Sequence, residues 1–311
     1  MKDKILNHIL YLSKGFAMGA ANVIPGVSGG TIALITGIFE RIINAIKSFN
    51  GTAIRLLFKG KIKELIRHTD FYFLVSVFMG MIASVITLAR LLEFLFSSYP
   101  VYIWAFFFGL ILASVYFVGR TIHKWNITII IVFIVATAVA FSVTFLNPAT
   151  ENDSFFYLVI CGVVAICSMI LPGLSGSFIL ILMGNYELVM IQAVNNAQIE
   201  ILFPVIIGAV IGLIAFSHIL SWVYKKFKDH TIAILTGFIL GSLSILWPWK
   251  DEIYRVNEAG GFIMKNGEKI VQGYSPYFPQ ALNTETVFAF VFICCGILTI
   301  TLIEKFASIK N

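Results

Sequence analysis

The chain has 311 residues, of which 59% are hydrophobic, 14% aromatic and only 12% charged. A soluble domain carries about twice that charged fraction, and a mean hydropathy of +0.93 means more apolar residues than one water-soluble core can bury. The composition excludes a cytosolic enzyme, a disordered chain and a nucleic-acid-binding module, and indicates an integral membrane protein. The net charge of +6 then concerns orientation in the bilayer, since Lys and Arg collect on the cytoplasmic side.

The first 14 residues are charged and have no small-residue cleavage site, so we expect a retained cytoplasmic end rather than a signal peptide. The four cysteines lie in apolar stretches without a C-x-x-C pair and a partner histidine. This pattern predicts small buried side chains rather than a metal site or a disulfide framework. We expect neither a metal nor a cofactor. The cysteines are Cys161, Cys167, Cys294 and Cys295.

Six segments reach the roughly 20 apolar residues that a helix needs to cross the hydrocarbon. Two further apolar segments are interrupted by proline and glycine, in the blocks 25–30 and 172–177. Each of these is either a kinked span or a re-entrant hairpin that returns to the side from which it came. The six predicted spans are residues 72–96, 101–119, 126–146, 201–224, 231–248 and 284–303.

The basic residues favour re-entrant hairpins, at about 15–46 and 155–194. Both chain ends and the basic stretch 47–67 then lie on one side of the membrane, as the positive-inside rule requires. A crossing first segment would place the basic N-terminus and the 47–67 stretch on opposite sides. We therefore predict cytoplasmic termini and an outer segment, 250–283, that contains a hairpin turned by Asn266-Gly267.

The chain also contains an internal repeat. A shift of 147 residues places Gly15 on Gly162 and the block Pro25-Gly26-Val27-Ser28-Gly29 on Pro172-Gly173-Leu174-Ser175-Gly176, and a later shift of 128 places Gly109 on Gly237. Each half, 1–150 and 151–311, then holds one re-entrant hairpin and three spans. Because three is odd, the second half enters from the opposite side. The sequence thus predicts an all-α membrane protein with an inverted repeat, as in many secondary transporters.

The two broken blocks are candidate anion sites. A half-helix is expected to begin after each block, at Gly30-Thr31 and at Ser177-Phe178, with its first amide groups unpaired and partly positive. Ser28 and Ser175 are expected to cap these helices or to donate to an oxygen of the ligand. Such a helix start suits a phosphate group. The alternative is a loop that merely kinks two helices.

Ionisable residues inside the membrane are rare and usually functional. Arg90 lies in the first span, one turn before Glu93, and the shift of 128 aligns it with His218 in the fourth span. We expect Arg90 to help draw out an anionic head group; the alternative is that it pairs with Glu93 or reaches the outer interface. The candidates for proton or sodium coupling are His218, Glu93, Glu40 and Glu187.

An enzyme is the rival from another functional class. Residues 26–30, Gly-Val-Ser-Gly-Gly, match the G-x-S-x-G nucleophile motif, and Ser28 with His218 would make the dyad of an intramembrane serine hydrolase. However, that motif requires a strand before the serine, and the serine block occurs twice in opposed halves.

Residues 51–69 form a basic amphipathic run that we expect on the cytoplasmic surface against anionic lipid.

Residues 15–40, from Gly15-Phe-Ala-Met-Gly-Ala-Ala-Asn22 to Gly37-Ile-Phe-Glu40, resemble the signature of the bacterial polyprenyl-phosphate transporters, and the resemblance covers nearly the whole chain. It implies translocation of undecaprenyl phosphate from the outer to the inner leaflet of the plasma membrane, which recycles the lipid carrier of cell-envelope synthesis. The runner-up is a cation-coupled transporter of a soluble organic anion. The implied partners are the polyprenyl phosphate and membrane lipids. The expected substrate-binding residues are Asn22, Pro25, Gly26, Ser28, Gly29, Gly30, Thr31, Arg90, Gly173, Ser175, Gly176 and Ser177.

Overall fold

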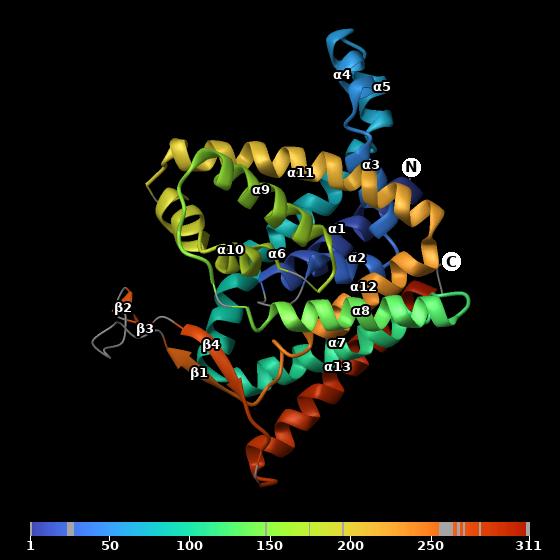
Figure 1. Cartoon of the computed structure of the whole chain (residues 1–311). Helices are drawn as coiled ribbons and strands as arrows, with labels where there is room; N and C mark the ends of the chain where they lie inside the picture. Colours follow the sequence, from blue (N-terminus) through green and yellow to red (C-terminus); the bar gives the residue numbers. More distant parts are fainter. Residues whose placement is uncertain are drawn as a thin grey trace.

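Helices make up nearly all of the regular structure (Figure 1). Apolar segments form helices because, where no water is present, each backbone donor and acceptor must find a partner within the chain. The computed structural model describes residues 2–23, 28–146, 148–173, 175–194, 196–254, 264–265, 268–269, 271–279 and 281–308.

The helices before residue 150 begin with the first broken segment and continue with a small hairpin and three longer helices. They are α1 (Lys2–Val23), α2 (Gly29–Ile35), α3 (Phe39–Lys47), α4 (Gly51–Phe58), α5 (Ile62–His68), α6 (Phe71–Ser98), α7 (Pro100–Gly119) and α8 (Ile127–Val143).

After residue 150 come the second broken segment, three longer helices and four short strands. They are α9 (Phe155–Ile170), α10 (Gly176–Leu182), the π-helix η1 (Glu187–Ala193), α11 (Ile199–Lys226), α12 (Lys228–Ser242), β1 (Lys250–Tyr254), β2 (Met264–Lys265), β3 (Glu268–Lys269), β4 (Val271–Pro276) and α13 (Thr284–Ser308).

Four helices of the described residues, α6, α7, α11 and α13, are long and apolar enough to cross a membrane. Large apolar side chains cover their outer surfaces; Ile86 is 72% exposed and Phe203 is 56% exposed. An apolar surface of this extent is stable next to lipid rather than water. The chain is therefore a multi-pass membrane protein, as predicted.

The two other predicted spans form shorter helices than expected. α8 has 17 residues and α12 has 15, against the predicted segments 126–146 and 231–248. α12 ends at Ser242 in a series of turns that precedes Pro248, and α8 ends in a turn before Pro148. Apolar composition continues past both helix ends, which is why the sequence suggested longer spans.

Helices of the two halves have matching bounds. α2 and α10 each have seven residues and begin 147 positions apart, at Gly29 and Gly176. α6 and α11 each have 28 residues and begin 128 positions apart. The turn after each seven-residue helix contains a glycine with positive φ, Gly37 at 70° and Gly184 at 73°, a conformation that a side chain disfavours. The similarity in sequence thus extends to helix lengths and turn geometry.

The same pair of helices packs closely in each half: α1 along α6, and α9 along α11. Glycine makes both contacts possible. A Cβ atom on Gly15 would overlap the carbonyl oxygen of Val77, and one on Gly162 would overlap that of Val205. Small residues at such crossings allow two helix backbones to touch in a membrane.

The remaining longer helices pair between the halves. α7 packs against α13, and α8 packs against α12. Again the contacts are close, because a Cβ atom on Gly109 of α7 would overlap the backbone of Ile293, and one on Gly237 of α12 would lie 2.6 Å from the carbonyl oxygen of Phe133. Neither half can therefore be separated from the other without exposing helix faces that are packed in the intact protein.

The main core also joins the two halves. Its largest fully buried side chains come from the start of α6, from α7, from α12 and from α13. Apolar side chains of this size fix the helices at close range because the interior is packed to crystal-like density. These side chains are Phe73, Ile111, Leu235, Ile239 and Ile300, together with Leu246 in the turns after α12.

The broken segments differ in detail from the prediction. α1 begins at Lys2 rather than near residue 15, because the charged residues before Lys14 favour a helix and no proline or glycine interrupts them. The half-helices begin at Gly29 and Gly176, slightly earlier than expected. α2 and α3 meet at an angle of 115°.

The strands add a small β element between α12 and α13. β1 pairs with β4 and β2 with β3, both antiparallel. In the second ladder Met264 pairs with Lys269 and Lys265 with Glu268, which agrees with the predicted hairpin. Its turn, Asn266-Gly267, lies outside the described residues.

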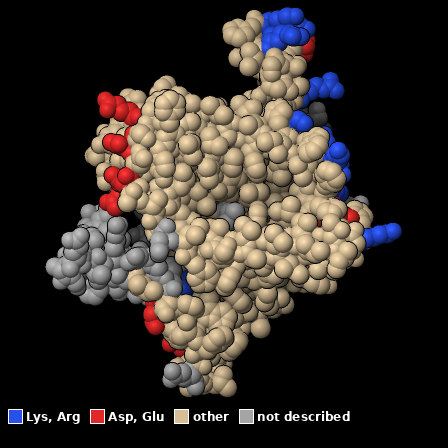
Figure 2. Space-filling view, viewed as in Figure 1, with Lys and Arg blue, Asp and Glu red and all other residues tan. Residues whose placement is uncertain are grey.

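Charged side chains gather on two opposite edges of the molecule. Figure 2 shows most of the visible Lys and Arg on the right edge and on a protrusion at the top, and most of the Asp and Glu on the left edge. Both chain ends lie on the basic side in Figure 1. The longer helices, such as α11 and α8, run from one edge toward the other.

Candidate functional site

The start of α2 is the centre of the first predicted site, and its amide groups already have acceptors. The amide of Gly29 donates to Oδ1 of Asn22 (2.7 Å), and that of Gly30 donates to Oγ of Ser28 (3.1 Å). The amide of Thr31 donates to the carbonyl of Ser28 at 2.9 Å. The predicted Ser28 cap is confirmed, but the expectation of unpaired amides at this helix start is wrong, because Asn22 and Ser28 satisfy them.

Ser28 also joins the two halves of the chain. Its buried hydroxyl lies 3.5 Å from the carbonyl oxygen of Met169 and 3.4 Å from that of Leu171, at the end of α9. Thr31, one turn further along α2, is 1% exposed, and its hydroxyl has no hydrogen-bond partner among the described residues. A buried hydroxyl without a hydrogen-bond partner costs free energy of folding. The Thr31 hydroxyl is therefore a polar group whose hydrogen-bonding capacity is not used within the described residues.

The corresponding start of α10 is built differently. The hydroxyl of Ser175 does not cap the helix and lies 2.7 Å from the hydroxyl of Ser177. Gly173 has a φ of 83°, and its Cα lies so close to α12 that a Cβ atom would meet the carbonyl oxygen of Phe238 at 2.5 Å. Gly176 is buried against the side chain of Met169. The side chain of Ser175 therefore does not cap this helix start, and its alternative role as a donor to an oxygen of the ligand stays a prediction.

A difference at one pair of equivalent positions accounts for much of this contrast between the two helix starts. The shift of 147 places Asn22 on Met169, so the side chain that holds the first helix start is a carboxamide and its counterpart is a thioether. Asn22 accepts the Gly29 amide, whereas Met169 packs on Gly176 as an apolar group. The first half therefore has the more polar site.

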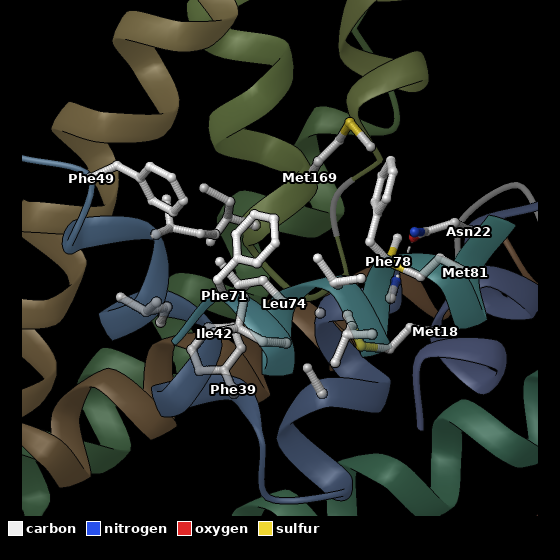
Figure 3. Close-up of a pocket in the computed structure, with 18 residues that line it drawn as sticks. Met18, Asn22, Phe39, Ile42, Phe49, Phe71, Leu74, Phe78, Met81 and Met169 are labelled. Atoms are coloured by element: carbon white, nitrogen blue, oxygen red, sulfur yellow. Dashed lines mark hydrogen bonds between the residues drawn. The ribbon is translucent and has the colours of Figure 1, made fainter. Parts of the chain in front are cut away.

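A cavity of about 400 Å³ begins at this polar point and continues between α1, α2, α3 and α6. Figure 3 shows Asn22, Phe78 and Met169 near one end and Phe49 at the other. Apart from Asn22 and two glycines, its walls are apolar or aromatic. The lining residues are Met18, Asn22, Gly29, Gly30, Ala33, Phe39, Ile42, Ile43, Ile46, Phe49, Phe71, Leu74, Val75, Val77, Phe78, Met81, Met169 and Ile170.

A cavity of this kind suits an amphipathic ligand. Its apolar length accommodates a hydrocarbon chain, whose burial is favourable at roughly 0.8 kcal/mol for each CH₂ group relative to water. The exposed carboxamide of Asn22 supplies amide hydrogens at the polar end. A small soluble anion would leave most of the apolar walls without a partner.

Several predicted site residues cannot be placed. Pro25 and Gly26 lie outside the described residues. Arg90 and Glu93 are on α6, but their side chains are outside the described part of the chain. The predicted roles of these four residues therefore stay predictions.

The other coupling candidates lie away from the cavity. His218 is half-buried on α11, where its Nδ1 atom is 2.8 Å from the carbonyl of Ile214. Glu40 lines a separate polar pocket, and Glu187 is the first residue of η1. The hydrogen bonds of Ser28 are made with α9 and α2, and that of His218 with its own helix. This geometry gives no support to a Ser28–His218 dyad.

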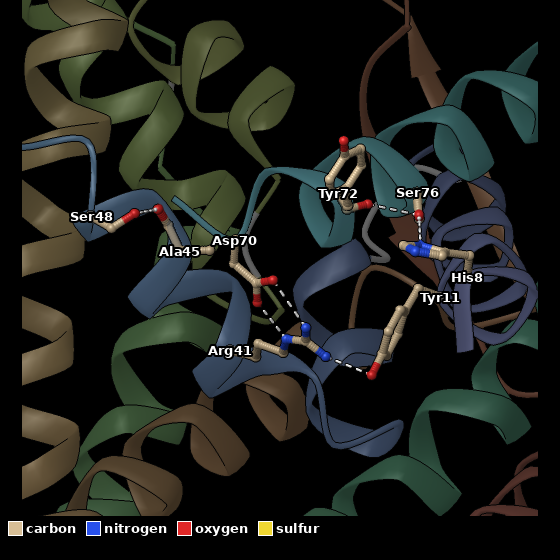
Figure 4. A network of polar contacts seen from close by, with 8 residues as sticks. All are labelled: His8, Tyr11, Arg41, Ala45, Ser48, Asp70, Tyr72 and Ser76. Carbon is tan, nitrogen blue, oxygen red and sulfur yellow. Dashed lines mark hydrogen bonds and ion pairs between the residues drawn. The ribbon is translucent and has the colours of Figure 1, made fainter. Parts of the chain in front are cut away.

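An ionic network that the sequence did not predict lies beside the middle of α1 and the start of α6 (Figure 4). Arg41 of α3 donates through Nε and Nη2 to the two carboxylate oxygens of Asp70, at 2.6 and 3.1 Å, and through Nη1 to the hydroxyl of Tyr11 at 2.5 Å. The guanidinium also lies 4.1 Å from the ring centre of Phe73. The sequence feature that could have predicted this network is Asp70, a single acidic residue directly before a predicted span and after a basic stretch.

The same network borders a polar pocket of about 420 Å³ on the opposite face of α3 from the apolar cavity. Nearby, the ammonium group of Lys14 donates to the carbonyl of Thr36 at 2.6 Å. Polar and apolar pockets thus share one helix as a wall. The polar pocket is lined by Gly37, Glu40, Arg41, Asn44, Ala45, His68 and Asp70.

A multi-pass helical bundle with broken helices and an amphipathic cavity is typical of membrane transport proteins. Residues 18–264 match the family described as undecaprenyl phosphate translocase-like. The chain is 38% identical over 311 residues to a polyprenyl-phosphate transporter of Vibrio cholerae serotype O1, with 99% of each chain covered. It is 31% identical over 252 residues to a polyprenyl-phosphate transporter of Staphylococcus aureus, with 76% of this chain and 84% of the relative covered.

The chain therefore belongs to the undecaprenyl phosphate translocase-like family, which confirms the resemblance seen in the sequence. No solved structure matches it.

Proposed function

We propose that this protein translocates a polyprenyl phosphate, undecaprenyl phosphate, from the outer to the inner leaflet of the bacterial plasma membrane, and so returns the lipid carrier for reuse. The single observation that carries this function is the apolar cavity with its polar end at Asn22 and α2. Family membership supports the substrate class, since the relatives are named polyprenyl-phosphate transporters. A transporter rather than an enzyme is the role that this combination favours.

In this proposal the head group binds at the start of α2. The amide hydrogens of Asn22 are donors for phosphate oxygens, and Gly29 and Gly30 let the ligand approach the backbone. Ser28 and Thr31 belong to the proposed site as buried neighbours of this end of the cavity, whose hydroxyls would reach the phosphate only after a local rearrangement. The prenyl chain lies in the cavity toward Phe49. Pro25, Gly26 and Arg90 complete the proposed site in the first half, and Gly173, Ser175, Gly176 and Ser177 form its counterpart in the second half.

We further propose that the two halves are inverted repeats with re-entrant hairpins, which exchange access between the leaflets. The matching lengths of α2 with α10 and of α6 with α11 support this arrangement. The separation of basic and acidic edges supports cytoplasmic chain ends. A proton or a sodium ion is the proposed coupling ion, with His218, Glu93, Glu40 and Glu187 as the groups to test.

The proposal predicts that Asn22→Leu slows translocation by about tenfold or more, because the polar end then loses a donor that faces a buried phosphate. The measurement uses proteoliposomes that contain a fluorescent polyprenyl phosphate, with a membrane-impermeant quencher to report the leaflet. Met169→Leu is the matched control, since it changes the same end of the cavity without removing a polar group, and it should keep the native rate.

An unchanged rate for Asn22→Leu would contradict this site. A second arm separates the two transporter hypotheses: excess soluble phosphate or a short organic anion should leave the rate unaffected, whereas an unlabelled long-chain polyprenyl phosphate should compete. Competition by the soluble anion alone would favour the transporter of a soluble organic anion.

A further inference from the structure

The hairpin formed by α4 and α5 has no counterpart in the second half. The two shifts of the repeat, 147 before it and 128 after it, differ by 19 residues, the length of the segment 51–69. Figure 1 shows this hairpin projecting from the helical body beside α3. An element that only one half carries is not required by the repeated architecture. The side chains on its own surface therefore indicate its role.

That surface is strongly basic. The hairpin has one acidic residue, Glu64, and its carboxylate is 2.8 Å from the ammonium group of Lys61. The remaining charges leave a net positive element. The basic side chains, all exposed, are Arg55, Lys59, Lys61, Lys63 and Arg67.

The same hairpin exposes large apolar side chains. Phe58 is 86% exposed, and Leu57 and Ile54 are 55% and 56% exposed. Residues at positions i, i+3 and i+4 lie on one face of a helix, so these three form an apolar stripe along α4. Ile62, 49% exposed, extends the apolar surface onto α5. A basic hairpin with an apolar stripe has the composition of elements that lie in a membrane interface.

Hydrogen bonds at its base hold the hairpin in place. Oδ1 of Asn50 accepts the amides of Thr52 and Ala53 at 2.9 and 3.3 Å, and lies 3.4 Å from Nε2 of His68 at the far end of α5. Asp70, two residues after His68, forms an ion pair with Arg41 of α3. The two ends of the hairpin are therefore held together, and the end after α5 is fixed to α3 through Asp70.

The direction in which the hairpin projects matches a membrane surface. In Figure 1 the longer helices run between the acidic and basic edges, whereas the hairpin projects across them, near the basic edge. An element with this placement extends sideways over the lipid that surrounds the bundle. We propose that the hairpin of residues 51–69 is an interfacial anchor that docks on the anionic lipid surface at the basic side of the protein, with Phe58 and its stripe inserted and the basic residues on the head groups.

Hydrogen–deuterium exchange of the full-length protein in nanodiscs tests this anchor. Amides of residues 51–69 should exchange roughly fivefold more slowly, or better, in discs that contain phosphatidylglycerol than in pure phosphatidylcholine discs, since each basic residue at an anionic surface contributes about that factor. High salt should reduce the protection. α6 serves as an internal reference that should not change.

Two variants complete the test. The combined change Arg55→Gln, Lys59→Gln and Lys63→Gln should abolish the dependence on phosphatidylglycerol, whereas Arg120→Gln with Lys124→Gln, exposed basic residues outside the hairpin, should leave it intact. Fast, unprotected exchange in both lipids would overturn the anchor, and strong protection of the same size in both lipids would overturn the role of anionic lipid. No transport is measured, so this result does not depend on the proposed function.

Discussion

At the scale of single residues, glycine sets how closely the helices pack. Gly15 lies on α1 where any Cβ atom would overlap the carbonyl of Val77 on α6. We expect Gly15→Ala to push the two helices apart and to lower the free energy of unfolding by about 1–3 kcal/mol, measured by thermal unfolding in detergent. Gly51→Ala is the matched control, because a Cβ atom there meets nothing within 4 Å. An equal loss in both variants would argue against the packing explanation.

Part of the candidate site was predictable from single residues, and part was not. The repeated blocks identified Ser28 and the approximate start of α2, because serine before a helix is a strong local signal. The partners of the amides were not predictable, since Asn22 lies on another helix and only the fold brings its carboxamide to Gly29. The end of α9 beside Ser28 depends in the same way on contacts between the halves.

At the scale of elements, the ion pair between Arg41 and Asp70 joins α3 to the start of α6. Asp70 has a φ of 48° and precedes α6 without capping it, because both carboxylate oxygens are held by Arg41. In the second half the positions of Tyr11 and Arg41 correspond to Leu158 and Leu188, which pack together in an apolar cluster. The two halves thus close the same junction with different chemistry.

We expect a double-mutant cycle of Arg41→Met and Asp70→Asn to give a coupling energy of about 0.5–1 kcal/mol, because the pair is bidentate but both side chains are about 40% exposed. Thermal unfolding at low and high salt measures it, and the coupling should weaken with salt. The Lys61–Glu64 pair, more exposed and one turn apart on one hairpin, provides the control cycle with a smaller value. A coupling of zero for Arg41 and Asp70 would show that the network does not stabilise this junction.

Element boundaries were predictable where proline and glycine interrupt apolar runs, which is why α1 and α9 end, and α2 and α10 begin, close to the predicted breaks. They were not predictable where the run continues, as after α12, or where charged residues extend a helix, as at the beginning of α1. The π-helix η1 also escaped prediction, since its sequence is that of an ordinary amphipathic helix.

At the scale of the whole molecule, a polar contact between a loop of the first half and a helix of the second ties the halves together. Nδ1 of His123, in the connection after α7, lies 3.0 Å from Oδ1 of Asp229 on α12. The hydrogen bond from His123 holds the pKa of Asp229 below its ordinary value. A carboxyl group with a lowered pKa adds stability above its unfolded pKa, and this stability is lost as the pH falls through the folded pKa.

We therefore expect Asp229→Asn to lower the melting temperature modestly near neutral pH, and the difference from the native protein to shrink as the pH falls below about 4. Thermal unfolding followed by tryptophan fluorescence over this pH series checks the sign. A difference that grows toward acid would contradict the assigned cause.

The pairing of α7 with α13 and of α8 with α12 has a consequence for biosynthesis. α13 follows α7 in the chain by more than 160 residues, so α7 leaves the ribosome and enters the bilayer long before its partner has been made. The face of α7 that contains Gly109 stays in lipid, or beside the translocon, until α13 has been made. Contacts between residues so far apart in the chain form slowly, and they make the completed protein, rather than its first half, the unit that assembles.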